Sequence, residues 1–215
     1  MDPIVVINPN STIRISHQIE SAVRSVAPSA LTTVLTSPGG PPAIESDQDV
    51  LDAIEPMIGL AQSQRASSFV IACFSDPGID ELRSVVDVPC FGIAECAVLV
   101  AMAQARNVGI ISSVDASIPR HERYWRRLGI SDRIVSDIAI GRGVLDLEGS
   151  EAFADTLATA REVVAGGAEV VVLGCTGLSH VRKDLAHALG VPVVDPCQAA
   201  TSMALSVRAE GGMSG

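Results

Sequence analysis

Short apolar runs alternate with amphipathic stretches along the whole chain. The runs are five to eight residues long and rich in valine and isoleucine, which is typical of strands buried in a sheet. Between them, apolar residues recur at helical spacing. The pattern predicts strands over residues 4–8, 31–37, 67–73, 88–94, 107–112, 133–140, 168–175 and 191–195. It predicts helices over 16–27, 49–64, 80–86, 95–106, 150–167, 178–189 and 196–207, and one more around Tyr124 and Trp125.

The order of these elements repeats once along the chain. Val108 follows Ile4 by 104 positions, Cys175 follows Cys73 by 102, and Pro192 follows Pro89 by 103. Alternating strands and helices favour parallel sheets with helices on their faces. We therefore expect an α/β fold of two pseudo-symmetric, Rossmann-like halves, each a mainly parallel sheet flanked by helices, with the active site between them. The expected division places residues 1–97 and 191–215 in the first half and 98–190 in the second.

Composition narrows the class of protein. The chain has 215 residues, 47% of them hydrophobic and 3% aromatic, with a formal net charge of −10. That charge argues against nucleic-acid binding, which needs a basic face to replace phosphate counterions. No apolar stretch reaches the roughly 18–20 residues of a membrane helix, and the N-terminal residues carry an acid instead of a basic leader. We expect a cytoplasmic protein that binds neither nucleic acid nor a membrane.

The sequence offers little to hold a cofactor or a metal. Neither GxGxxG nor GxxxxGK[ST] occurs, so these phosphate-binding signatures are missing. Lys183 is the single lysine, and its place in a helix with His180 and Arg182 is unpromising for a pyridoxal phosphate Schiff base. The five cysteines form no CxxC pair, which supports neither a disulfide framework nor a zinc site. We expect chemistry by side chains alone, with no cofactor and no metal.

Two cysteines occupy equivalent places in the repeat. Cys73 and Cys175 each end an apolar strand and precede small, turn-forming residues. Ligands of open α/β sheets bind at the carboxyl ends of the strands, so the two thiols should face one cleft. Backbone amides after each strand can stabilise a thiolate or a developing oxyanion. The pair is predicted to be catalytic, one thiolate removing a proton while the opposed thiol supplies one. Cys90, Cys96 and Cys197 are expected to be apolar fillers.

The motifs INPNST (7–12), ACFSDPGID (72–80), FGIAE (91–95), LGCTGL (173–178) and VPVVD (191–195) resemble the hydantoin and allantoin racemases of the aspartate/glutamate racemase superfamily. The resemblance covers about residues 4–207. It implies cofactor-independent racemisation by two cysteines, which Cys73 and Cys175 match, and it suggests a homo-oligomer. The expected substrate is a small molecule, most simply a 5-substituted hydantoin or allantoin, whose stereogenic C–H lies beside a carbonyl.

Other residues at the strand ends are expected to contact the substrate or to shape the site. Asn8 is a candidate for hydrogen bonds to the ring, with Asn10 beside it, although NPN equally suits a turn and a helix cap. Glu95 and His180 are auxiliary candidates, His180 because a nearby histidine can help to ionise a thiol. The segment HERYWRR (121–127) predicts an exposed amphipathic helix. The expected substrate-binding residues are Asn8, Phe74, Ser75, Asp76, Ser112, Ser113, Thr176 and Gly177.

Three alternatives stay open on the sequence. GCTG (174–177) also suits an amino-acid racemase of the aspartate/glutamate type, although few cationic residues are expected near the cleft to hold carboxylates. A maleate-type cis–trans isomerase also uses two cysteines. A non-catalytic ligand-binding or thiol-sensing protein is the alternative from a different class, and it would need Cys73 and Cys175 close enough for a disulfide.

Overall fold

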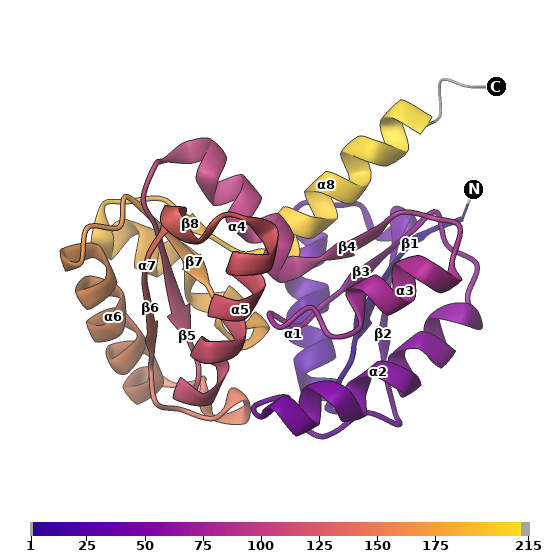
Figure 1. Cartoon of the computed structure of the whole chain (residues 1–215), viewed down its shortest axis with the longest axis horizontal. Helices are drawn as coiled ribbons and strands as arrows, with labels where there is room; N and C mark the ends of the chain where they lie inside the picture. Colours follow the sequence, from indigo (N-terminus) through magenta and orange to yellow (C-terminus); the bar gives the residue numbers. More distant parts are fainter. Residues whose placement is uncertain (1, 212–215) are drawn as a thin grey trace.

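The computed structural model describes residues 2–211. Two four-stranded sheets stand side by side, each with helices on its faces (Figure 1). No helix within residues 2–211 has the length and apolar character needed to cross a membrane. The predicted α/β class with two similar halves is confirmed.

The first sheet has the strand order β2-β1-β3-β4, and all its strand pairs are parallel. The central strands β1 and β3 are buried along their whole length, whereas the edge strand β2 is partly exposed. The strands are β1 (Ile4–Asn8), β2 (Thr32–Thr36), β3 (Ser68–Ile71) and β4 (Cys90–Gly92), and the helices are α1 (Ile13–Arg24), α2 (Asp47–Gln62) and α3 (Ile79–Val85).

The second sheet repeats this arrangement with the order β6-β5-β7-β8, again all parallel. The same order in both sheets explains the constant offset in the sequence. The strands are β5 (Val108–Ser112), β6 (Ile134–Ala139), β7 (Val170–Leu173) and β8 (Val193–Val194), and the helices are α5 (Ile118–Leu128), α6 (Ser150–Ala165) and α7 (Arg182–Leu189). Short 3-10 turns cover Ser29–Leu31, Asp115–Ser117, Ser131–Arg133, Val144–Asp146 and Thr176–Val181.

Two further helices join the halves. Helix α4 (Ile93–Gln104) packs on α8 (Pro196–Gly211), and the two lie at the junction between the sheets (Figure 1). Helix α8 also packs on β1, β3 and β4. The C-terminal helix therefore contacts the first sheet. Strand β8, however, pairs with β7 and belongs to the second sheet, so the segment 191–215 does not lie wholly in the first half.

The core follows the alternation of side chains along each strand. Ile4 and Val6 of β1 face one apolar cluster, which continues through α4 and α8 into the second half. Val5 and Ile7 face a second cluster, on the side of the sheet that α2 and α3 cover. The shared cluster fixes the two halves relative to each other, and with them the strand ends that face across the gap.

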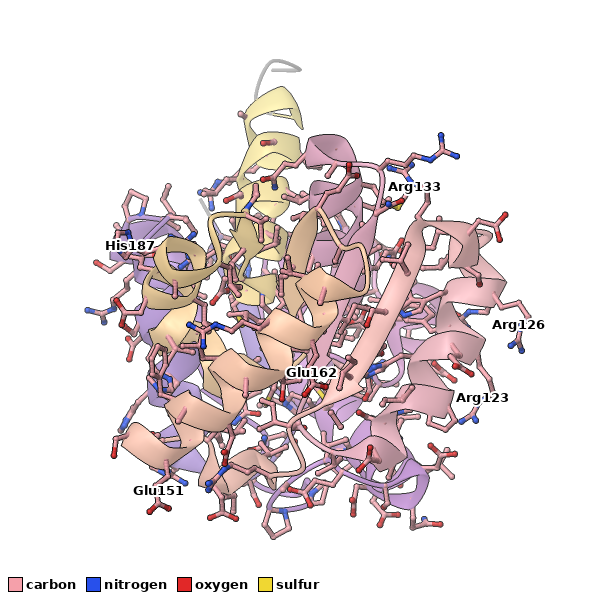
Figure 2. All side chains as sticks on the ribbon, turned by 90° about the vertical axis from the view of Figure 1, so that its left-hand side faces the viewer. Arg123, Arg126, Arg133, Glu151, Glu162 and His187 are labelled. Atoms are coloured by element: carbon pink, nitrogen blue, oxygen red, sulfur yellow. The ribbon has the colours of Figure 1, made fainter. Side chains whose placement is uncertain are left out.

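Helix α5 lies on the side of the second half that faces the first half (Figure 1). Its residues His121 and Trp125, four positions apart, are buried and pack with Phe74 of the first half. The arginines of the helix are more exposed, and Arg123 and Arg126 extend from its outer side (Figure 2). The expected amphipathic helix is present, but one face of it is buried at the junction.

Candidate active site

The two predicted cysteines occupy equivalent positions in the two halves. Cys73 lies two residues after the end of β3, and Cys175 two residues after the end of β7. The preceding residues extend the two ladders in the same way: Ala72 N–H donates to Ile7 O at 2.8 Å, and Gly174 N–H donates to Ile111 O at 2.8 Å. The repeat thus places one thiol at the carboxyl end of the equivalent strand in each sheet.

Both thiols line one cavity between the halves. Its volume is about 30 Å³, room for a water molecule or two, so the loops around it must part before a larger molecule fits. Cys73 is partly buried and Cys175 is buried. The remaining lining residues are Asn10, Ile44, Ala72, Phe74, Ser75, Ser113, Ser117, Arg120, His121, Val144, Gly174 and Thr176.

Loops from the two halves close the cavity. Ile44 comes from the loop before α2, and Val144 from the turn after β6. The backbone N–H of Val144 donates to Glu45 Oε1 at 2.7 Å. This hydrogen bond ties the loops together across the gap, so access to the thiols requires that it breaks or moves with them.

The two thiols lie in different electrostatic surroundings. Burial raises the pKa of Cys73 to about 11, while hydrogen bonds from the Ser75 backbone and hydroxyl and the charge of Arg120 oppose that rise. Burial raises the pKa of Cys175 to about 12, and among the groups near it only the backbone N–H of Gly177 lowers it. Charge on Cys73 raises the pKa of Cys175 further, as expected for thiols that share a cavity. More neighbouring groups therefore oppose the effect of burial at Cys73 than at Cys175, although the charge of Asp76 adds to the rise at Cys73.

Six of the ten residues expected at the site line this cavity: Cys73, Phe74, Ser75, Ser113, Cys175 and Thr176. Gly177 lies just outside the lining and contributes its backbone N–H to Cys175. The sequence therefore indicates the part of the site that follows the two equivalent strands.

Asn8 and Asp76 do not line the cavity. Asn8 is fully buried, and its amide nitrogen donates to Asn10 Oδ1 at 2.9 Å and to Ser16 Oγ at 3.0 Å, which holds the loop after β1. Asn10 lines the cavity instead. Asp76 accepts from the backbone N–H groups of Ala94 and Glu95 at 3.0 and 2.9 Å. It therefore caps α4.

The cap on α4 also connects the halves. Tyr124 of α5 donates its hydroxyl to Asp76 Oδ2 at 3.1 Å. Burial raises the pKa of Asp76 to about 7, against the hydrogen bonds that favour its charged form. Asp76 adopts a positive φ of 42°, the left-handed conformation that its turn after Cys73 requires. Its carboxylate thus anchors both α4 and α5 near the first thiol.

Ser112, Glu95 and His180 also lie outside the cavity lining. Ser112 donates to Asp137 Oδ1 at 2.6 Å, behind the site. Glu95 pairs with Arg83 at 3.0 Å, and the exposed His180 borders a separate surface groove with Arg14, His17 and Lys183. Their positions support no direct contact with a molecule held between the thiols.

Among the lining residues that the sequence analysis did not assign to the site, Arg120 and His121 are the two with basic side chains. His121 Nδ1 lies 2.9 Å from Asp137 Oδ2 and 3.3 Å from Ser112 Oγ. Arg120 donates from Nε to Ser75 Oγ at 3.0 Å and from Nη1 to Asp47 Oδ1 at 2.7 Å. Within residues 2–211, no three histidine, cysteine or acidic side chains are placed to hold a metal ion.

Comparison with known proteins identifies the family. The family profile described as Asp/Glu/Hydantoin racemase matches residues 4–204. A hydantoin racemase of Paenarthrobacter aurescens is 32% identical over 216 residues, which cover 97% of this chain and 92% of that protein. A hydantoin racemase of Pseudomonas sp. (strain NS671) is 34% identical over 211 residues, covering 95% of this chain and 85% of that protein.

Solved structures agree with this match. Allantoin racemase from Klebsiella pneumoniae superimposes with a TM-score of 0.89 at 28% identity, covering 98% of this chain and 89% of that one. Match, fold and paired strand ends all point to an isomerase that acts on a small molecule. The chain belongs to the Asp/Glu/hydantoin racemase family and is a hydantoin-racemase-like enzyme.

Proposed function

We propose that this chain is a cofactor-independent racemase of a 5-substituted hydantoin or allantoin that works by proton transfer between two cysteines. The observation that carries the proposal is the shared cavity of Cys73 and Cys175, one from each half and each two residues past an equivalent strand. Relatives named hydantoin racemase and a structure named allantoin racemase support the substrate class.

The reaction begins with a proton on a carbon beside a carbonyl. The Cys73 thiolate takes the proton from C5, and the C–H electron pair moves into the ring, which places negative charge on the carbonyl oxygen. The Cys175 thiol then gives its proton to the opposite face of C5. The stereocentre is inverted, Cys73 is now the thiol, and Cys175 is now the thiolate. The reverse direction starts from that state, so both enantiomers are substrates.

Hydrogen-bond donors are needed where the oxyanion develops. Ser113 and Thr176 line the cavity and carry hydroxyl groups, and they directly follow β5 and Cys175 respectively. Removal of a single such donor in other enzymes costs on the order of 10²–10³ in rate. These hydroxyls and the backbone amides beyond the strands are the groups we assign to that role.

The test is exchange of the C5 proton for deuterium in D₂O, followed by chiral chromatography. Single enantiomers of 5-substituted hydantoins and of allantoin are compared with aspartate, glutamate and maleate. Wild type should exchange a ureide and lose its optical purity, and neither Cys73→Ser nor Cys175→Ser should do so. If aspartate, glutamate or maleate is converted and no ureide is, the substrate class proposed here is wrong and the acid is the substrate. Silence across the panel, with rapid Cys73–Cys175 disulfide formation, would favour a thiol sensor.

Two expectations from the sequence remain predictions. The enzyme should be a homo-oligomer, which light scattering on a gel-filtration column tests. It should work in the cytoplasm, because both thiols must stay reduced to carry protons.

A further inference from the structure

Helix α5 brings a guanidinium to the wall of the cysteine cavity. The Arg120 side chain is 11% exposed, and it lines the cavity beside Ser75. Two of its nitrogens are used, Nε by Ser75 and Nη1 by Asp47. Its Nη2 is covered by the protein and has no hydrogen-bond partner among the described residues. A buried N–H group of a charged side chain is costly to leave unpaired, so a bound acceptor would stabilise it.

The acidic residues near Arg120 do not fully neutralise its positive charge. Asp47 accepts from Arg120 through one oxygen and from Arg123 through the other, at 2.7 and 2.9 Å, so one carboxylate serves two guanidinium groups. Asp47 is 63% exposed, and water competes for it. The other acid at the rim, Glu45, is engaged by the backbone N–H of Val144. Arg120 therefore has charge and one donor available for a further anion.

His121 is the next residue on the same wall. Its Nδ1 faces the Asp137 carboxylate, and Ser112 donates to the other oxygen of that carboxylate. We assign the Nδ1 proton to the bond with Asp137, because the carboxylate can only accept. Because the contacts with Asp137 and Ser112 both use Nδ1, Nε2 is the ring atom left for a ligand. Phe74, which also lines the cavity, packs edge-on against the ring with centroids 5.2 Å apart and fixes its plane.

Taking the proposed racemisation as given, we propose that Arg120 and His121 form a subsite for a carboxylate on the substituent of the substrate. The substrate class is then a hydantoin whose C5 substituent ends in a carboxylate. Arg120 Nη2 would donate to the carboxylate, and His121 Nε2 would donate when the ring is protonated. C5 itself would stay between the two thiols.

The test compares two substrates of nearly equal size and shape. 5-(Carboxymethyl)hydantoin carries a charge, and 5-(carbamoylmethyl)hydantoin is its neutral counterpart. Wild type should show a kcat/KM at least about tenfold higher for the acid, as a charge-assisted hydrogen bond implies. Arg120→Gln should lower kcat/KM for the acid about 10–100-fold more than for the amide, because its effect on the pKa of Cys73 is common to both substrates. Arg120→Lys should restore part of the preference, because it keeps the charge.

Arg123→Gln is the matched control. Arg123 shares Asp47 with Arg120 but does not line the cysteine cavity, so its loss should change the preference for the acid far less than Arg120→Gln does. Thermal unfolding of every variant separates loss of binding from loss of fold. His121→Asn should also weaken the preference, because it removes the Nε2 atom from the wall of the cavity.

The outcomes separate the subsite from the proposed function. Equal kcat/KM for acid and amide in wild type would overturn the subsite and leave the racemase standing. A preference that survives in Arg120→Gln would also overturn it. If no ureide exchanges at all, the proposed function fails. Exchange of aspartate or glutamate that Arg120→Gln abolishes would then support the carboxylate subsite and overturn the hydantoin part.

Discussion

The Nε–H of Arg120 donates to Ser75 Oγ at 3.0 Å, which joins the second half of the molecule to a residue two positions after Cys73. Because the hydroxyl oxygen accepts this bond, its own proton is free to point elsewhere. Hydrogen bonds from Ser75 and the charge of Arg120 lower the pKa of Cys73 against the effect of burial. A residue of one half thus helps to set the protonation of the thiol in the other.

Ser75→Ala should slow alkylation of Cys73. The variant loses a hydroxyl hydrogen bond that favours the thiolate, so the pKa of Cys73 should rise and its thiolate fraction should fall. Iodoacetamide at pH 8, in a Cys175→Ser background, should therefore react more slowly with Cys73. Ser117→Ala is the control, since that cavity hydroxyl donates to Val114 O. Equal rates in Ser75→Ala would contradict the assignment.

Asp76 should make stability depend on pH between about 4 and 7. Its folded pKa of about 7 lies above the ordinary value of 3.8, so in this range the folded state holds a proton that the unfolded state has lost. The stability that this proton contributes is therefore fully present below about pH 4 and is lost as the pH rises to 7. The loss in the free energy of unfolding is at most about 1.4 kcal/mol for each unit by which the folded and unfolded pKa values differ. Urea unfolding at pH 5 and pH 7 measures this loss.

Asp76→Asn should flatten that pH dependence, because the amide does not titrate. Asp80→Asn is the control, because Asp80 is 56% exposed and pairs with Arg127 at 2.6 Å. Wild type and Asp76→Asn with parallel pH profiles would show that the folded pKa of Asp76 is not raised.

Gly92→Ala should displace the cap of α4. A Cβ at residue 92 would lie 2.2 Å from Asp76 Oδ2, where no real side chain fits. The carboxylate would have to leave the N–H groups of Ala94 and Glu95, at a cost of about 1–3 kcal/mol. Urea unfolding should show this loss of stability. Gly59→Ala is the matched change, because nothing lies within 4 Å of that Cβ. It should stabilise α2 by about 0.5–1 kcal/mol. Equal effects of the two changes on stability would contradict the assignment of Asp76 as the cap of α4.

Trp125→Ala should destabilise the chain far more than Trp125→Phe. Trp125 is 2% exposed and packs with Tyr124, Phe74 and His121. Truncation of a buried tryptophan to alanine costs about 3–5 kcal/mol. Phenylalanine keeps most of the packing and loses no hydrogen bond, since the indole nitrogen has no partner within residues 2–211. Circular dichroism must follow the unfolding, because this is the only tryptophan. Similar midpoints for both variants would place Trp125 outside the core.

The sequence predicts the features that are local or repeated. Buried apolar runs identify the strands, and the offset of about a hundred residues identifies two equivalent halves. Ligands bind at the carboxyl ends of parallel strands, and Cys73 and Cys175 follow equivalent strands of two similar halves. The sequence therefore predicts that both thiols face one cleft.

The rest of the site depends on contacts between the halves, which local periodicity does not encode. HERYWRR predicts an exposed helix because arginines dominate it, yet Arg120 and Arg123 meet Asp47, more than seventy residues earlier in the chain. His121 is buried with its Nδ1 atom next to Asp137 and Ser112, which lie on or beside the neighbouring strands. His180 is close to Cys175 in sequence, but the intervening 3-10 turn places it on the surface.

The most direct test of the two-cysteine account is where deuterium first appears. A single enantiomer of a substrate hydantoin is incubated with enzyme in D₂O, and product and recovered substrate are separated after a few per cent conversion. A solution without enzyme corrects for spontaneous exchange. Two opposed thiols predict deuterium in the inverted product and almost none in the recovered enantiomer, because the second thiol exchanges with solvent before it delivers its proton. Equal labelling of both enantiomers from the start would mean that one base serves both faces, and the account would be wrong.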